Sequence, residues 1–231
     1  MSTGAILLCA GRGERLGAGV PKAFVPLAGR PLFAWSLAAL QRCDEVGAIV
    51  VVGPVATARE LLAASGGSFD RIVAFIEGGA ERQHSVARGL AALPPEHGMV
   101  AVHDAARALV TPALVARTLA AAHAHGAAIA AVPLGDTLKS VVGGRITGTP
   151  SRAGLWCAQT PQVFRRDWLD AAHAAATATF TDDAALVEAL GHEVWIAEGD
   201  PLNFKITTAA DLALAEAWLA HGGADATGGR T

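Results

Sequence analysis

Short apolar runs alternate with longer amphipathic segments along the first part of the chain. The runs are rich in β-branched or aliphatic residues, which predicts strands over 5–10, 48–52, 72–76, 99–103 and 127–132. The segments between them repeat apolar residues three or four positions apart, which predicts helices over 32–42, 56–65, 83–93 and 112–125. Pro112 directly after Thr111 fits a capped helix start. This alternation predicts an α/β fold with a mostly parallel sheet covered by helices on both faces.

The pattern changes at Thr137. Residues 138–142 and 145–149 flank Gly143-Gly144, which is a strong signal for a hairpin with a two-residue turn. A projecting hairpin exposes a long strand edge, and such an edge usually needs a partner. We therefore expect residues 137–158 to form an arm that packs against a second subunit. A β-meander folded onto its own domain is the alternative.

Beyond the arm, the pattern returns to helices and strands. It predicts strands over 155–160 and 193–197 and helices over 166–176, 182–190 and 209–219. Thr181-Asp182-Asp183 is typical of a helix start with acidic residues in the first turn. No internal repeat and no linker is visible. We expect residues 1–221 to form one domain and the polar, glycine-rich residues 222–231 to be a disordered tail.

Composition limits the class of protein. The 231 residues suffice for one α/β domain, and the net charge of -3 without a long basic run argues against general nucleic-acid binding. No apolar run approaches the ~20 residues of a membrane-spanning helix. The N-terminus lacks the basic region and cleavage site of a signal peptide. A cytoplasmic protein that binds neither nucleic acid nor membrane is the resulting expectation.

The glycine-rich turn after the first apolar run is the most informative chemical signal. Gly11 and Gly13 let the backbone approach a ligand closely, and N–H groups of such a turn cradle phosphate oxygens. Arg12, Arg15 and Lys22 add positive charge to the same place. The turn therefore predicts a nucleoside triphosphate site, and an ordinary turn between a strand and a helix is the alternative.

Two other phosphate-binding loops do not fit this turn. A Walker loop requires Ser or Thr after its lysine to hold a magnesium ion, and Ala23 follows Lys22. A dinucleotide-binding loop requires a third glycine, and Leu16 occupies that position.

Further polar motifs follow other predicted strands, whose carboxyl ends hold the ligand in folds of this type. Gly78-Gly79 opens a helix in which Ser85 offers one more hydrogen bond to a base, although a helix cap needs no function. Asp104 ends a strand, where a carboxylate binds magnesium or a substrate hydroxyl. Arg107 pairs either with Asp104 or with phosphate; an ion pair that only orders the loop is the alternative.

Two basic residues later in the chain are candidate phosphate ligands. Arg152 closes the arm, and its planar guanidinium matches a phosphate with two hydrogen bonds. Lys205 follows the last predicted strand and is one of only three lysines, with Lys22 and Lys139. A lysine acts as a compact point charge on one phosphoryl oxygen. Lysines that are merely solvated at the surface are the alternative.

Together these segments resemble the 2-C-methyl-D-erythritol 4-phosphate cytidylyltransferase family of the non-mevalonate isoprenoid pathway. The resemblance runs from about Ala5 to Leu219. Its motifs are Ala-Gly-x-Gly-x-Arg…Pro-Lys at 10–22, Gly-Gly-x-x-Arg-x-x-Ser-Val at 78–86, His-Asp-Ala-Ala-Arg at 103–107, Asp-Thr at 136–137, Gln-Thr-Pro-Gln-x-Phe at 159–164, Thr-Asp-Asp-Ala at 181–184 and Asn-x-Lys-Ile-Thr at 203–207. Cys9 and Ala108 depart from the usual Ala and Pro, and Ala80 replaces a residue that is often acidic.

The resemblance implies a Rossmann-like nucleotidyltransferase domain that transfers CMP from CTP to methylerythritol phosphate and releases pyrophosphate, with Mg²⁺ as cofactor. It assigns catalysis to Arg15, Lys22, Arg152 and Lys205. It assigns the binding of CTP to Cys9, Ala10, Gly11, Gly13, Gly79, Ala80, Ser85, Asp104 and Ala105. It assigns the acceptor substrate to Asp104, Arg107, Thr137, Arg152, Thr160, Thr181 and Lys205, with Asp104 also the candidate metal ligand.

The same resemblance implies a homodimer in which Thr137 and Arg152 of the arm enter the neighbouring subunit's site. Three alternatives remain open: a ribitol-5-phosphate cytidylyltransferase, a sugar nucleotidyltransferase that uses UTP or GTP, and a non-catalytic nucleotide-binding regulator. The retained cationic residues argue against the regulator, because a binding module needs no groups that stabilise a transition state.

Overall fold

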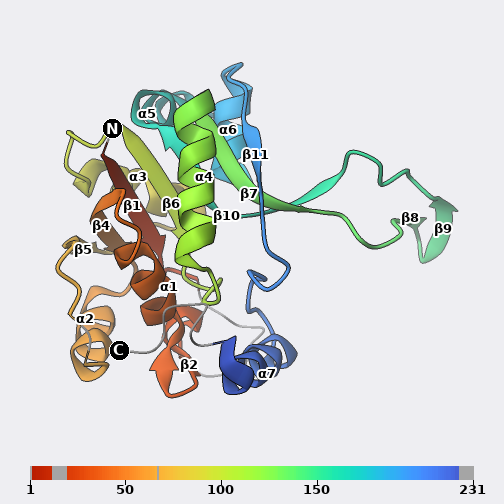
Figure 1. The fold of residues 1–231 in the computed structure, drawn as a ribbon. Helices are drawn as coiled ribbons and strands as arrows, with labels where there is room; N and C mark the ends of the chain where they lie inside the picture. Colours follow the sequence, from red (N-terminus) through yellow and green to blue (C-terminus); the bar gives the residue numbers. More distant parts are fainter. Residues whose placement is uncertain (1, 12–19, 67, 224–231) are drawn as a thin grey trace.

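A seven-stranded sheet forms the centre of the fold in the computed structural model, which describes residues 2–11, 20–66 and 68–223 (Figure 1). Its strand order is β11-β7-β10-β6-β1-β4-β5. The strands are β1 (Thr3–Leu8), β4 (Val46–Val52), β5 (Ile72–Ile76), β6 (Met99–Asp104), β7 (Ala127–Pro133), β10 (Trp156–Arg165) and β11 (Trp195–Glu198). Only β10 runs antiparallel to its neighbours β6 and β7 within this described sheet. The predicted mostly parallel sheet is therefore confirmed.

Helices cover both faces of this sheet, as the alternating pattern predicts (Figure 1). They are α1 (Leu32–Gln41), α2 (Val55–Ala64), α3 (Arg82–Ala92), α4 (Pro112–His125), α5 (Arg166–Ala175), α6 (Asp183–Ala189) and α7 (Ala209–Trp218). Consecutive residues of β1 point into opposite layers: Leu7 packs in the cluster that contains α1 and α4, and Ile6 in the cluster that contains α3, α5 and α6. Each layer thus has its own apolar core, which fixes the sheet between them.

Two predicted helix starts are confirmed by their caps. The Leu114 N–H donates to Thr111 Oγ1 over 3.1 Å at the start of α4. The Ala185 N–H donates to Asp182 Oδ1 over 3.0 Å at the start of α6. Each cap satisfies an N–H group that has no partner within the helix. The predicted bounds of all seven helices lie within a residue or two of those observed.

A small satellite core lies beside the sheet. It packs α7 against a short hairpin of β2 (Pro26–Leu27) and β3 (Arg30–Pro31), through Leu27, Trp35 and Ile206 among others. A 3₁₀ turn over Lys22–Phe24 precedes the hairpin. These short elements carry no periodic signal, so the sequence pattern did not predict them. They hold the segment that follows the glycine-rich turn against the body of the fold.

The predicted arm is confirmed as a hairpin of β8 (Ser140–Val142) and β9 (Arg145–Gly148), which projects from the body (Figure 1). Its turn residues Gly143 and Gly144 have φ values of 55° and 80°, which glycine adopts without strain. The arm leaves the sheet at Pro133 and returns at Trp156, and these two residues pair across β7 and β10. The arm is therefore rooted at one point of the sheet.

The strand after the arm differs most from expectation. The apolar pattern predicts a strand only to residue 160, whereas β10 continues to Arg165 and inserts between β6 and β7. Gln159, Thr160 and Gln162 are buried polar residues, and they interrupt the pattern that would have revealed the full strand. Of the predicted tail, residues 224–231 lie outside the described residues. No helix in the described ranges is long and apolar enough to cross a membrane.

Candidate active site

A cavity of about 380 Å³ opens where β1 and β6 end, between Ala10-Gly11 and the start of α3. This is the edge at which the carboxyl ends of parallel strands hold ligands in α/β folds. Its lining comprises Leu8, Cys9, Ala10, Gly11, Lys22, Ala23, Gly79, Ala80, Glu81, Arg82, Ser85, Asp104, Ala106 and Lys205. Motifs that lie far apart in the sequence therefore meet, as the order of the strands predicts.

The first wall of the cavity is the chain that leaves β1. The Cys9 N–H donates to Val52 O over 2.7 Å, and the Lys22 N–H donates to Gly11 O over 3.3 Å. The Cys9 thiol itself is buried, and burial raises its pKa far above the ordinary range of a thiol. Cys9 therefore offers backbone rather than thiolate chemistry. The predicted residues Arg12, Gly13 and Arg15 lie outside the described residues.

The opposite wall is the turn that opens α3. Ser85 Oγ donates to Glu81 O over 3.1 Å and accepts the Gly79 N–H over 3.0 Å, so this hydroxyl fixes the shape of the turn. A Cβ on Gly78 would lie 2.5 Å from Ala10 Cβ, and one on Gly79 would lie 2.4 Å from His84 Cβ. Both glycines are therefore required by close packing. The turn presents backbone groups of Gly79 and Ala80 at the cavity.

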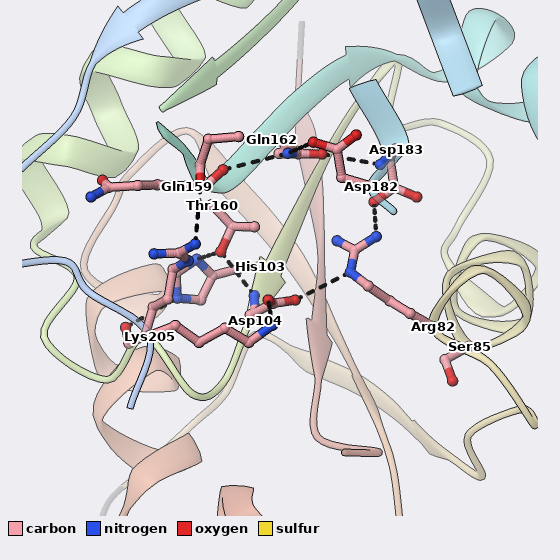
Figure 2. A network of polar contacts seen from close by, with 12 residues as sticks. Arg82, Ser85, His103, Asp104, Gln159, Thr160, Gln162, Asp182, Asp183 and Lys205 are labelled. Atoms are coloured by element: carbon pink, nitrogen blue, oxygen red, sulfur yellow. Dashed lines mark hydrogen bonds and ion pairs between the residues drawn. The ribbon is translucent and has the colours of Figure 1, made fainter. Parts of the chain in front are cut away.

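Asp104 lies at the centre of an alternating chain of charges at the end of β6 (Figure 2). Its Oδ2 lies 2.7 Å from Lys205 Nζ, and its Oδ1 lies 3.4 Å from Arg82 Nε. Burial alone would raise the pKa of the Asp104 carboxyl, but the Lys205 and Arg82 charges outweigh burial and hold that pKa well below its usual range. Asp104 is therefore a fixed carboxylate with two cationic neighbours.

The backbone N–H of Asp104 is held by the buried hydroxyl of Thr160, which in turn contacts the buried imidazole of His103 (Figure 2). The Asp104 N–H donates to Thr160 Oγ1 over 3.0 Å, and Thr160 Oγ1 lies 3.0 Å from His103 Nδ1. Burial lowers the pKa of His103 from 6.5 to about 4, so the imidazole is neutral at pH 7. A neutral Nδ1 accepts the Thr160 proton, which leaves the Thr160 oxygen to accept from Asp104.

Two glutamines on β10 brace the loops on either side of this centre. Gln159 Nε2 donates to Asp200 O over 2.8 Å, and its Oε1 accepts from Asn203 Nδ2 over 3.1 Å. Gln162 Oε1 accepts the Asp183 N–H over 3.2 Å at the start of α6. The Gln-Thr-Pro-Gln segment therefore sets the loop that leads to Lys205 and the helix that follows residue 181, without itself lining the cavity.

Several predicted site residues lie outside the cavity in the single chain. Arg107 donates to Asn203 O over 2.9 Å and to Ala158 O over 3.1 Å, and its charge also helps to lower the pKa of the Asp104 carboxyl. Ala105 and Thr160 are buried beside the cavity, and Thr181 is exposed before α6. Thr137 and Arg152 lie on the arm, where the Arg152 guanidinium contacts Gly135 O. Their roles toward substrate stay predictions.

Arg82 and Asp183 are charged residues of the site that the sequence interpretation did not assign. Arg82 lines the cavity and contacts Asp104, and its Nη1 lies 2.7 Å from Asp183 Oδ2. Both residues stand within quoted motifs, so their charge was the available signal. What the pattern does not give is that the starts of α3 and α6 lie next to each other on the same face of the sheet.

The structure carries few candidate metal ligands. Across the described ranges, no group of three or more His, Cys, Asp or Glu residues is arranged to hold a metal ion. Asp104 and Glu81 supply the carboxylates of the cavity lining. Carboxylate oxygens suit Mg²⁺, which is usually held by one or two carboxylates together with substrate phosphates.

Comparisons with known proteins agree with this geometry. Residues 3–221 match the profile of the family described as 2-C-methyl-D-erythritol 4-phosphate cytidylyltransferase. The enzyme of that name from Prochlorococcus marinus (strain MIT 9313) is 47% identical over 93% of this chain and 97% of its own. The one from Frankia casuarinae is 48% identical over 94% of this chain and 81% of its own. The crystal structure of the Thermus thermophilus enzyme aligns with a TM-score of 0.75 at 39% identity, over 94% of this chain and 98% of that one.

Proposed function

This chain belongs to the 2-C-methyl-D-erythritol 4-phosphate cytidylyltransferase family, and on that premise we propose how its residues carry out the reaction. The enzyme transfers CMP from CTP to 2-C-methyl-D-erythritol 4-phosphate, forming 4-diphosphocytidyl-2-C-methyl-D-erythritol and pyrophosphate in isoprenoid precursor biosynthesis. The observation that carries the proposal is one cavity that is lined by Lys22, Arg82 and Lys205, in which Arg82 and Lys205 contact the Asp104 carboxylate. CTP and the acceptor phosphate bind together there.

The chemistry asks mainly for positive charge and alignment. A phosphate of the acceptor is already a nucleophile at neutral pH, so no general base is needed; the bond that forms joins its oxygen to the α-phosphorus of CTP, and the bond that breaks releases pyrophosphate. Negative charge accumulates around phosphorus as this happens. Lys22, with Arg15, stabilises that charge and the leaving pyrophosphate. Lys205 and Arg152 align the acceptor phosphate.

Cytosine is recognised mainly by backbone groups. Ala10 and Cys9 on one wall and Gly79 and Ala80 on the other line the same cavity. Ser85 supports this contact by fixing the turn that carries Gly79. Main-chain recognition also accounts for the tolerance of Cys9 and Ala80 at positions where relatives of the family carry other side chains.

Mg²⁺ fits this site as an ion that arrives with CTP. Asp104 is a deprotonated carboxylate at the cavity, but both of its oxygens already face cations, and the lining supplies too few carboxylates for a cage made by protein alone. We therefore assign the principal coordination to the triphosphate, with Asp104 as the protein ligand. The ion, when bound, neutralises charge on the phosphates.

The arm is the proposed dimer contact. Val141, Val142 and Ile146 are 54%, 70% and 60% exposed on it in the single chain. Apolar side chains on a projecting hairpin are stabilised when another surface covers them. A second copy of the chain also explains why Arg152 and Thr137 lie away from the cavity of their own subunit: they complete the neighbouring site.

The assay for this reaction follows pyrophosphate release from CTP, Mg²⁺ and methylerythritol phosphate, with ribitol 5-phosphate in a parallel reaction. Lys22→Ala is expected to lower turnover more than about a hundredfold, because it removes a charge that acts on the transition state. Its thermal unfolding should match that of the parent. Near-normal turnover would remove Lys22 from the catalytic role, and release with ribitol 5-phosphate alone would overturn the acceptor.

A mixing experiment tests whether two subunits share each site. Lys22→Ala and Arg152→Ala are each expected to be inactive, but in a mixed dimer one site carries both defects and the other carries neither. After unfolding and refolding together, the mixture should recover about a quarter of the parent activity, since half of the dimers are mixed and half of their sites are intact. No recovery, despite mixed dimers detected by mass spectrometry, would place Arg152 in its own subunit's site.

A further inference from the structure

A second carboxylate, fully buried, contacts Arg82 of the site described above. Asp183 is the first residue of α6, its side chain is 0% exposed, and its Oδ2 accepts from Arg82 Nη1 over 2.7 Å (Figure 2). Its other oxygen, Oδ1, lies 3.3 Å from His173 Nε2 on α5. Both atoms are buried, and neither has a hydrogen-bond partner in the described part of the chain, so this is a close approach rather than a hydrogen bond. Asp183 is therefore enclosed by Arg82 and His173.

Arg82 uses two different nitrogens on two carboxylates. Nη1 binds Asp183, and Nε faces Asp104 Oδ1 over 3.4 Å. The shorter of the two contacts is made to the more deeply buried carboxylate. The Asp183 side chain is fully buried, and its backbone N–H donates to Gln162 Oε1. The planar guanidinium of Arg82 thus links the start of α6 to the Asp104 carboxylate at the cavity.

Lys205 is the exposed end of this chain of charges. Lys205 Nζ binds Asp104 Oδ2, and the Lys205 side chain is 41% exposed, against 26% for Arg82. Lys205 belongs to a loop after β11, whereas Arg82 and Asp183 are the first residues of two helices on one face of the sheet. Of the two cations on Asp104, Arg82 is therefore the rigidly anchored one.

We infer that Asp183 is a positioning residue, which acts through Arg82 to fix the direction of the Asp104 carboxylate and so the placing of Lys205. This inference rests on the role proposed above for Asp104. It explains the order of charges from Asp183 to Lys205, and it explains why an acidic residue is buried at a helix start whose cap is supplied by its neighbour Asp182. A buried charge of this kind is otherwise costly to keep.

The first test compares isosteric substitutions in the pyrophosphate assay. Asp183→Asn keeps the shape but removes the charge, and should lower kcat/KM about tenfold or more, because small displacements of positioned groups cost that much. The parameter that changes, kcat or KM, should be the one that Asp104→Asn changes. Glu188→Gln is the matched control: the same charge is removed from an exposed position of α6, and activity should not change.

A double-mutant cycle separates positioning from general damage. Arg82→Met breaks the link, and once it is broken, adding Asp183→Asn should lower activity less than about twofold further. The double variant removes the Asp183 charge together with that of its partner Arg82, so neither is left without the other. It therefore remains informative if Asp183→Asn alone does not fold. Arg82→Lys should not rescue activity, because one ammonium group cannot span both carboxylates.

The outcomes are distinct. Non-additive losses with the same kinetic pattern as Asp104→Asn support the inference. Normal activity of Asp183→Asn beside a defective Asp104→Asn would overturn it, as would losses that multiply in the double variant. Normal activity of both Asp104→Asn and Asp183→Asn would overturn the proposed role of Asp104 itself.

Discussion

The buried imidazole of His103 makes the stability of this protein depend on pH in a defined window. In the folded protein its pKa is lowered from 6.5 to about 4 by burial, and its ring nitrogens contact Thr160 Oγ1 and the Arg107 carbonyl. Well above pH 6.5 the side chain is neutral in both the folded and the unfolded state, so it adds no pH dependence. Below pH 6.5, His103 becomes protonated in the unfolded chain but stays neutral in the folded chain until the pH nears its folded pKa of about 4. Stability therefore falls as the pH falls.

The size of the effect follows from the gap between the two pKa values. One pH unit of difference corresponds to about 1.4 kcal/mol, so a fall from 6.5 to about 4 corresponds to about 3 kcal/mol of unfolding free energy. The loss accumulates between about pH 6.5 and the folded pKa of about 4. This is a large fraction of the stability of a domain, which is usually about 5–15 kcal/mol.

Urea unfolding at several pH values, followed by far-UV circular dichroism, measures this loss. His103→Asn keeps an acceptor for Thr160 but cannot titrate, so it should be less stable at pH 8 yet lose about 3 kcal/mol less than the parent on acidification. His221→Asn, which alters an exposed histidine, is the control and should keep the parent's slope. Equal losses in the parent and His103→Asn would refute the reasoning, because the imidazole would then not be the group that takes up the proton.

Two further predictions follow from the packing of the site and the arm. Gly79→Ala would place a Cβ 2.4 Å from His84 Cβ, so the turn must move, and KM for CTP in the pyrophosphate assay should rise about tenfold or more; an unchanged KM would contradict the backbone contact proposed for this turn. Val142 is 70% exposed on the arm, so Val142→Asp should leave the folded subunit intact but weaken the proposed dimer by about tenfold or more, measured by light scattering across a dilution series. Dimers of unchanged stability would exclude the tip of the arm from the interface.

The sequence pattern predicts the sheet and its helices because both layers are apolar and the strands are regular. It predicts the arm because Gly143-Gly144 can adopt the positive φ values of a tight hairpin turn. It does not predict that β10 lies between β6 and β7, since pairing between distant strands leaves no local trace. The polar residues at the centre of that strand also remove the apolar signature on which such predictions depend.

Site residues could be predicted from the sequence where the residue type itself suits a chemical task, as a lysine suits a phosphate. They could not be predicted where a residue acts by positioning another residue. Lys22 and Lys205 are rare lysines in an arginine-rich chain, and both line the cavity. Arg82 and Asp183 were missed, because their importance arises from the contact between two helix starts that lie far apart in the sequence. Arg107 donates to two loop carbonyls in the single chain, and its predicted role toward substrate stays a prediction.

The arm leaves and rejoins the sheet at one point, and this affects how its length can vary in evolution. Pro133 and Trp156 are paired, and the Leu134 N–H donates to Leu155 O over 3.0 Å, so the chain closes the sheet before the arm begins. Lengthening a connection that starts and ends at one place costs little, since closure entropy grows only with the logarithm of its length. Natural variation can therefore shorten or extend residues 138–151, which lie between Thr137 and Arg152, while the sheet stays the same. The tip of the arm, where the proposed contact between subunits lies, is in this way free to vary while Thr137 and Arg152 keep their places near its root.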